Sequence, residues 1–272
     1  MTFQGKSILI TGGSKGIGKA IAREFAGRGA NVFLVARGLP ALESARDEIA
    51  RDFPAVRVGI VQADVANREQ SVAAVEAMRQ EFGGIDGIVN NAGAAVPKYF
   101  EESLPEEFED TIRTGYLGSV YCTHAAYPQM KSGSFVAFTS SVAGFLGAFG
   151  YTSYCPAKFA QMGFAEALYY EAALKGIQVS VLCPPDTATP GFDEENKTKP
   201  FETAELGKTA KLMQADAVAR GFVDQLAKGR FLITVNRESA VLYRLTRLLP
   251  KFSRRLMLGM VKSARKRRDA GK

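Results

Sequence analysis

Short and nearly continuous apolar runs alternate with longer stretches of helical periodicity along most of the chain. The runs, rich in Val, Ile, Leu and Phe, occupy residues 6–12, 30–37, 56–65, 84–93, 133–141, 177–185 and 230–235. A strand that is apolar along its whole length is buried on both faces, and helices between successive strands make the sheet parallel. We therefore predict an α/β fold with a doubly wound parallel sheet of the Rossmann type, formed by residues 1–236 as a single domain. Because ligands bind such sheets at the carboxyl ends of the strands, the residues after each strand are the candidates for chemistry.

The last part of the chain, residues 237–272, has a different pattern. Apolar residues recur every three or four positions with basic residues between them, which predicts an amphipathic helical segment that Pro250 interrupts. The apolar positions are Val241, Leu245, Leu248, Phe252, Leu256 and Met260. This segment carries twelve Lys or Arg against two Asp or Glu, a net charge of +10, so the total of +7 leaves −3 for residues 1–236.

A basic amphipathic segment of this kind fits the surface of an anionic membrane, where each cation contributes roughly 1 kcal/mol. The alternative is that the apolar stripe docks on the domain or on a second subunit while the cations stay solvated. We do not expect nucleic acid as a partner, because no aromatic stacking platform accompanies the basic residues. A spanning helix is not predicted either, because no uncharged apolar run reaches about eighteen residues.

The beginning of the chain has neither a charged lead nor a long apolar stretch, which predicts a cytoplasmic protein, with the basic segment on the cytoplasmic face of a membrane. Cysteine and histidine suggest no metal site. Cys122, Cys155 and Cys183 are an odd number without ligand spacing, and His124 is the single histidine. We therefore expect neither a structural disulfide nor a metal ion.

The first predicted strand ends in a glycine-rich turn, TGGSKGIG, that leads into a helix. Gly12, Gly16 and Gly18 allow the backbone to turn tightly and to approach a pyrophosphate, whose charge the free N–H groups at the helix N-terminus stabilise. Such a turn alone can simply connect two elements without binding a ligand. Its place between a strand and a helix favours dinucleotide binding.

The second predicted strand ends at Ala36 and Arg37, where a dehydrogenase that prefers NAD carries an acidic residue. Together with Lys15 in the glycine turn, Arg37 can bind a 2′-phosphate through charge-assisted hydrogen bonds. This pair favours NADPH as the cofactor. The alternative is two solvated surface cations.

These motifs resemble the short-chain dehydrogenase/reductase family across nearly the whole of residues 1–236. The resemblance is carried by the spacing G-x-x-x-G-x-G in the turn, ADV at 63–65, NNAG at 90–93, Ser141, and the pair Tyr154 and Lys158. It implies a reduction in which Ser141 hydrogen-bonds the substrate carbonyl, Tyr154 protonates the alkoxide and Lys158 holds the nicotinamide ribose. The cofactor contacts predicted from the residues and the resemblance together are Gly12, Ser14, Lys15, Gly16, Ile17, Gly18, Arg37, Asp64, Val65, Asn91, Ala92, Gly93, Tyr154, Lys158, Pro184, Thr187 and Thr189.

The spacing of Tyr154 and Lys158 has a physical reason. Residues four apart on a helix lie on one face about one turn apart. We therefore expect the ammonium to stabilise the tyrosinate and to lower the pKa of the phenol, which is otherwise near ten.

Two positions depart from the family pattern. Gly115 stands where an asparagine is common and offers no side chain to support a proton-relay water, so either backbone and water replace it or turnover is slower. Pro156 falls in the first turn of the predicted helix, where the N–H that it lacks would be unpaired anyway.

The segment PPDTATPGFDEENKTKP, residues 184–200, is most similar to the 3-ketodihydrosphingosine reductases, as are GYLGSVY and GFLGAFGYTSY. The resemblance implies NADPH-dependent reduction of the 3-keto group of a long-chain 2-amino-1-hydroxy ketone in sphingolipid synthesis. Phe145, Phe149 and Phe192 are candidates for substrate contact, with core packing as the alternative. The acidic residues 193–195 could attract the substrate's ammonium group, or form a solvated turn.

Other readings stay open. The substrate could be another hydrophobic ketone, such as a steroid, a retinoid or a 3-oxoacyl group, or the protein could be a low-turnover NADP-binding sensor. The helix that follows Tyr154, KFAQMGFAEALYYEAAL, is apolar on more than one face, which predicts a homodimer or homotetramer.

Overall fold

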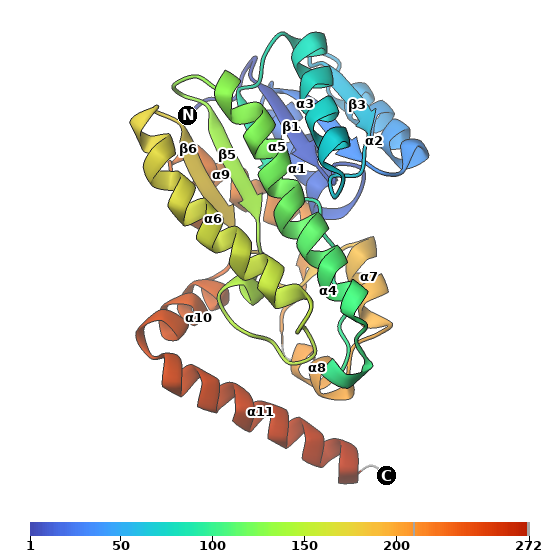
Figure 1. Cartoon of the computed structure of the whole chain (residues 1–272), viewed down its shortest axis with the longest axis vertical. Helices are drawn as coiled ribbons and strands as arrows, with labels where there is room; N and C mark the ends of the chain where they lie inside the picture. Colours follow the sequence, from blue (N-terminus) through green and yellow to red (C-terminus); the bar gives the residue numbers. More distant parts are fainter. Residues whose placement is uncertain (209, 271–272) are drawn as a thin grey trace.

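The computed structural model describes residues 1–208 and 210–270. At its centre is a seven-stranded parallel sheet with the strand order β3-β2-β1-β4-β5-β6-β9 (Figure 1). The strands are β1 (Ser7–Thr11), β2 (Asn31–Ala36), β3 (Val58–Gln62), β4 (Gly87–Asn90), β5 (Phe135–Thr139), β6 (Gln178–Leu182) and β9 (Leu232–Ile233). Each lies within one of the apolar runs, so the predicted doubly wound parallel sheet is confirmed.

Helices cover both faces of this sheet. One face packs against α1 (Gly16–Gly27), α2 (Leu39–Asp52) and α9 (Ala215–Ala227); the other packs against α3 (Arg68–Phe82), α5 (Gly118–Ala126) and α6 (Tyr154–Leu174). Successive strand residues alternate between the two cores, as Ile8 and Ile10 do on one side and Leu9 on the other. Both sets are apolar because neither face meets water.

The order of the strands reverses between β1 and β4, which pair directly although two strands separate them in the sequence. The carboxyl ends of strands on either side of such a switch point diverge and leave a crevice. Above it, α4 (Pro105–Thr111) continues through the π-helical segment η2 (Ile112–Leu117) into α5. Three short 3₁₀ helices lie in the same part of the chain: η1 (Phe100–Glu102), η3 (Tyr127–Gln129) and η4 (Val142–Gly144).

The segment after β6 forms structure that the sequence pattern did not indicate. β7 (Thr187–Ala188) pairs with β8 (Met213–Gln214) in a two-stranded parallel ladder. Between them lie the short helices α7 (Pro190–Asn196) and α8 (Phe201–Gly207). In Figure 1, α7 and α8 lie together with α4 on one side of the molecule.

The chain ends in α10 (Arg237–Leu248) and α11 (Pro250–Ala270), and residues 271–272 of the predicted basic segment lie outside the described residues. Pro250 is the first residue of α11, so the predicted interruption of the helical pattern is confirmed. Figure 1 shows α11 below α8, away from the sheet. Among the described helices, none is long and apolar enough to cross a membrane.

Ion pairs fasten α11 to the domain. Arg265 and Arg268 each lie 3.2 Å from a carboxylate oxygen of Glu202, whose side chain is fully buried. The hydroxyl of Tyr99 donates to the same carboxylate at 2.6 Å. The buried residues of α11 are Ser253 and Ala264, so small side chains form the packed face of this helix. Most of the apolar positions predicted for this segment are exposed to solvent: Val241, Leu248, Phe252, Leu256 and Met260.

Candidate active site

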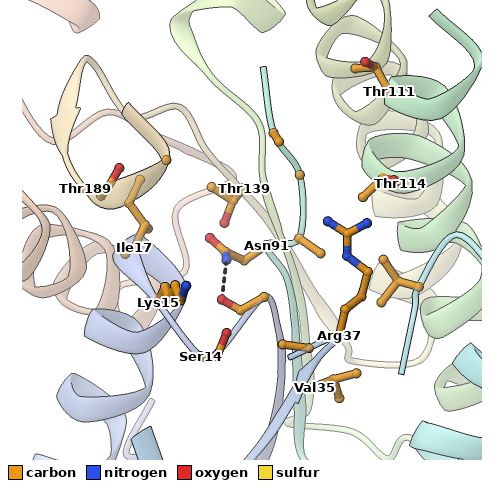
Figure 2. Close-up of a pocket in the computed structure, with 18 of the residues that line it drawn as sticks. Ser14, Lys15, Ile17, Val35, Arg37, Asn91, Thr111, Thr114, Thr139 and Thr189 are labelled. Atoms are coloured by element: carbon orange, nitrogen blue, oxygen red, sulfur yellow. Dashed lines mark hydrogen bonds between the residues drawn. The ribbon is translucent and has the colours of Figure 1, made fainter. Parts of the chain in front are cut away.

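A crevice of about 710 Å³ opens at the carboxyl ends of the strands, a volume within the usual range for small-molecule sites (Figure 2). Every predicted cofactor residue lines it except Gly18 and Thr187. Those that do are Gly12, Ser14, Lys15, Gly16, Ile17, Arg37, Asp64, Val65, Asn91, Ala92, Gly93, Tyr154, Lys158, Pro184 and Thr189. Residues at the ends of six strands, β1 to β6, and in the segments that follow them therefore converge on one cavity.

The glycine turn is held in place by the end of β4. The hydroxyl of Thr11 accepts hydrogen bonds from the backbone N–H groups of Asn91, at 2.9 Å, and Ala92, at 3.1 Å. The Asn91 side chain donates back to the carbonyl of Thr11 at 3.1 Å, and Figure 2 shows it reaching toward the turn. Gly12 has a φ of 66° and Gly16 a φ of 53°, which L side chains rarely adopt.

This turn leaves donors available for a phosphate. Lys15 is the N-cap of α1, and no side chain caps the first N–H groups of that helix. Unpaired N–H groups at a helix N-terminus favour an anion. Gly18 does not line the crevice, and a Cβ there would lie 2.3 Å from the Gly12 carbonyl oxygen. Gly18 thus permits close packing of the turn.

Two cations stand beside the crevice without a counter-charge. The side chains of Lys15 and Arg37 are exposed, and neither forms a hydrogen bond or ion pair with another described residue. Figure 2 shows Arg37 extending across the crevice toward the side formed by Thr111 and Thr114. An acidic residue at the end of β2 would repel a phosphate at this point, whereas Arg37 attracts one.

Ser141, Tyr154 and Lys158 meet at the ends of β5 and α6. Tyr154 is the first residue of α6, and the Lys158 ammonium nitrogen lies 5.4 Å from the centre of its ring. Ser141 is the N-cap of η4, where its hydroxyl oxygen accepts from Ala143 N–H at 3.1 Å. Because that oxygen accepts, the hydroxyl hydrogen of Ser141 can still be donated, and Ser141 lies close enough to Tyr154 for a hydrogen bond that lowers the pKa of the phenol.

The predicted lowering of the Tyr154 pKa is wrong for this structure. Shielding from water raises the pKa of the Tyr154 phenol, the charge of Glu195 raises it further, and the hydrogen bond with Ser141 opposes both. The prediction considered the pair alone and omitted the cost of burying a phenolate. Tyr154 is therefore a protonated acid at neutral pH. Burial also lowers the pKa of Lys158 to about 8, because the charged form loses its water.

Six predicted residues lie outside the lining of the crevice: Gly18, Ser141, Phe145, Phe149, Thr187 and Phe192. The buried hydroxyl of Thr187 donates to the Pro185 carbonyl at 2.8 Å. Phe145 packs edge-on against Tyr243 of α10, with ring centres 5.2 Å apart. Phe149 stacks edge-on with Tyr99, and the ammonium of Lys199 lies over the ring of Phe192. Substrate contact by Phe145, Phe149 and Phe192 stays a prediction.

The sequence reasoning missed part of the lining. Thr139 and Ser140 precede Ser141 at the end of β5, and Glu107, Asp110, Thr111 and Thr114 come from α4 and η2. The rule that strand ends carry chemistry would have found the first two. No sequence signal marks the other four, because they belong to α4 and η2, which lie between two strands in the sequence and meet the crevice only in the folded chain.

The acidic residues after Thr189 separate by environment. The Glu194 side chain is 71% exposed and pairs with Lys197, whereas that of Glu195 is 18% exposed. Tyr151 donates its hydroxyl hydrogen to the Glu195 carboxylate, and the Lys199 ammonium lies 3.3 Å from it. Glu195 is close enough to Tyr154 to change its pKa. One carboxylate of the three thus faces the catalytic candidates.

Known proteins are similar to this chain in sequence and in fold. Residues 6–200 match the family model for short chain dehydrogenases. A 3-dehydrosphinganine reductase of Danio rerio is 40% identical over 253 residues, which cover 90% of this chain and 76% of that protein. A short chain dehydrogenase/reductase from Burkholderia phymatum, solved with NAD, superposes with a TM-score of 0.82 at 25% identity and covers 93% of this chain and 96% of its own.

A short chain dehydrogenase from Burkholderia cenocepacia, solved with NADP, superposes with a TM-score of 0.76 at 26% identity and covers 87% of this chain and 98% of its own. The two solved neighbours thus hold different cofactors, and their fold alone does not choose between them. The match to the family model and the extent of the identity show that this chain belongs to the short-chain dehydrogenase family.

Proposed function

We propose that this protein reduces the 3-keto group of 3-ketodihydrosphingosine to the alcohol of dihydrosphingosine, with NADPH as the reductant. The observation that carries the proposal is the identity of 40% to a reductase with this substrate, spread over 90% of the chain. The crevice supports it, because Ser141, Tyr154 and Lys158 meet beside a cavity suited to a dinucleotide.

The residues divide the chemistry among them. NADPH, when bound, supplies the hydride that adds to the carbonyl carbon. Ser141 donates its free hydroxyl hydrogen to the keto oxygen and so orients the carbonyl. As the C=O π electrons move to oxygen, Tyr154, which is protonated at neutral pH, donates its proton to that oxygen. Lys158, at 5.4 Å from the ring, stabilises the tyrosinate that remains.

A substrate panel tests this function. NADPH oxidation by the full chain should be fastest with 3-ketodihydrosphingosine and at least tenfold slower, in kcat/KM, with a 3-oxoacyl thioester, a steroid ketone or retinal. A preference for one of the other ketones would replace the proposed substrate. Tight NADPH binding without turnover of any ketone would favour the sensor alternative.

We also propose that Glu195 binds the ammonium group of this substrate. Its carboxylate is mostly shielded, accepts a hydrogen bond from Tyr151, lies 3.3 Å from the Lys199 ammonium, and raises the pKa of Tyr154. The ring centres of Tyr151, which donates to Glu195, and of Tyr154 are 6.0 Å apart, which supports a position for Glu195 close to the catalytic candidates. The 2-ammonium of the substrate is one carbon from its keto group.

Replacing Glu195 by Gln should raise KM for 3-ketodihydrosphingosine by roughly 10-fold to 30-fold, the effect of one charge-assisted hydrogen bond. KM for the analogue without the amino group should change less than about threefold, because that analogue has no charge to lose. Glu194→Gln is the matched control, since Glu194 faces solvent. Equal losses for both substrates would refute the ammonium role and leave Glu195 as a structural residue.

For the C-terminal helices we propose contact with an anionic membrane surface. Exposed apolar side chains on α10 and α11 are flanked by basic residues that have no partner on the domain, such as Lys251, Arg254 and Arg255 among the described residues. A lipid-like substrate also favours this placement. Figure 1 shows both helices below the sheet, with α11 at the lower end of the molecule.

Full-length protein with Phe252→Asp and Leu256→Asp should bind vesicles of phosphatidylcholine and phosphatidylglycerol at least tenfold more weakly than the unaltered chain, by co-sedimentation. Both side chains are exposed, so the fold should persist. Val72→Asp, at an exposed position on α3, is the control and should change nothing. Equal binding by all three proteins would argue for docking of the stripe on another subunit.

A homo-oligomer stays a prediction. α6 exposes Phe159, Tyr169, Tyr170 and Leu174, which supports burial of this helix against a second copy.

A further inference from the structure

Lys158 has a buried polar partner that the proposed chemistry does not use. Gln161, three residues further along α6, is fully buried, and its carboxamide oxygen accepts a hydrogen bond from the Lys158 ammonium at 3.2 Å. The ammonium also donates to the Thr139 carbonyl at 2.7 Å. Since an ammonium has three hydrogens, one remains for the crevice that Lys158 lines.

The other end of the Gln161 carboxamide meets η2. Its amide nitrogen donates to the Gly115 carbonyl at 2.7 Å and to the Ser119 hydroxyl oxygen at 2.9 Å. The Ser119 hydroxyl in turn donates to the same Gly115 carbonyl at 2.8 Å. All of these groups are buried, so each needs a partner inside the protein.

This network fixes which way the carboxamide points. The Ser119 hydroxyl donates its only hydrogen to the Gly115 carbonyl and can therefore only accept from Gln161. Gln161 must then direct its N–H groups toward the Ser119 oxygen and the Gly115 carbonyl. The reverse orientation would set the carboxamide oxygen against the Gly115 carbonyl and the NH₂ group against the Lys158 ammonium. The carboxamide oxygen therefore has to face Lys158.

We propose that Gln161 is a positioning residue for catalysis: its carboxamide, anchored by Gly115 and Ser119, holds the Lys158 ammonium beside Tyr154 and occupies the place of a water molecule between Lys158 and the Gly115 carbonyl. That carbonyl accepts from both Gln161 and Ser119, so both of its lone pairs are used. Position 115 has no asparagine side chain, and the Gln161 carboxamide of α6, 46 residues further along the chain, supplies the polar group there instead.

The protonation of Lys158, followed through the pH dependence of kcat/KM, tests this role of Gln161. Burial lowers the pKa of Lys158 to about 8, so kcat/KM for reduction should fall as pH rises through that value and the ammonium is lost. The oxygen of Gln161 bonds best to the charged amine and so opposes this loss. The other ionisable groups that face Lys158 or share its crevice are Tyr154, Cys183, Lys15, Arg37, Asp64, Glu107 and Asp110.

Two variants of Gln161 should move this titration in opposite directions. Gln161→Leu removes the acceptor and should shift the falling limb of kcat/KM to lower pH by about one unit, the equivalent of one hydrogen bond. Gln161→Glu places a carboxylate beside the ammonium and should shift the limb to higher pH. Gln178→Leu removes another hydrogen-bonded carboxamide, which is partly buried at the amino end of β6, and should leave the limb in place.

The proposal rests on the proposed reductase function only for the activity readout. The pH dependence of NADPH affinity, followed by NADPH fluorescence, reports the same charge without turnover, and melting temperatures show that each variant is folded. If the wild type binds NADPH but reduces no ketone, the proposed function fails and the binding profiles still decide the role of Gln161. A limb in Gln161→Leu that coincides with the wild type, or a shift of equal size in Gln178→Leu, would overturn the role of Gln161.

Discussion

Tyr154→Phe should lower kcat/KM for 3-ketodihydrosphingosine about 10³-fold, within the range expected when a general acid is removed. The substitution deletes one hydroxyl and keeps the ring that lines the crevice. Because the developing alkoxide then lacks its proton donor, the loss should fall mainly on kcat. NADPH affinity should change by less than about threefold, since the ring and Lys158 remain.

Tyr170→Phe is the matched control, with the same substitution at an exposed position on the same helix. Its kcat/KM should equal that of the wild type. Steady-state NADPH oxidation measures the activities, and quenching or enhancement of NADPH fluorescence measures the affinities. If Tyr154→Phe kept more than a tenth of the activity, another group would have to supply the proton.

Arg37→Gln should raise KM for NADPH roughly 10-fold to 100-fold and leave KM for NADH within about threefold, because charge-assisted hydrogen bonds contribute about 1.5–3 kcal/mol and only NADPH carries the 2′-phosphate. Arg37 is exposed and has no counter-charge among the described residues, so its removal should leave the fold unchanged. The selectivity for NADPH over NADH should fall by the same factor.

Arg46→Gln on α2 provides the comparison, since Arg46 pairs with Asp47 and does not line the crevice. Neither cofactor's KM should change in that variant. Salt should weaken NADPH binding more in the wild type than in Arg37→Gln, because charge attraction is screened. An unchanged NADPH preference in Arg37→Gln would mean that Lys15 or backbone groups recognise the phosphate.

The sheet and the strand ends could be predicted because they depend on local patterns. A strand buried on both faces has to be apolar throughout, and the turn between β1 and α1 needs glycine at Gly12 and Gly16, whose φ angles are positive. The position of Pro250 likewise marks the start of α11. The ladder of β7 and β8 escaped prediction, because two-residue strands leave no periodicity to read.

The parts of the site that could not be predicted arise from contacts between distant segments. Gln161 acquires its role only where α6 meets η2, and nothing in its local sequence distinguishes it from a surface glutamine. Burial of Glu202 under Arg265 and Arg268 depends in the same way on the path of α11. The pKa of Tyr154 depends on its burial and on the charge of Glu195, neither of which the motif shows.

Transfer of the label from NADPH that carries deuterium at both C4 positions of the nicotinamide tests the central claim most directly. Incubation of the full chain with this cofactor and 3-ketodihydrosphingosine, followed by mass spectrometry, should give dihydrosphingosine with one deuterium at C3. The same reaction with Tyr154→Phe should give about a thousandth of the labelled product. Unlabelled product, or no dihydrosphingosine while another ketone takes up the label, would contradict the assignment.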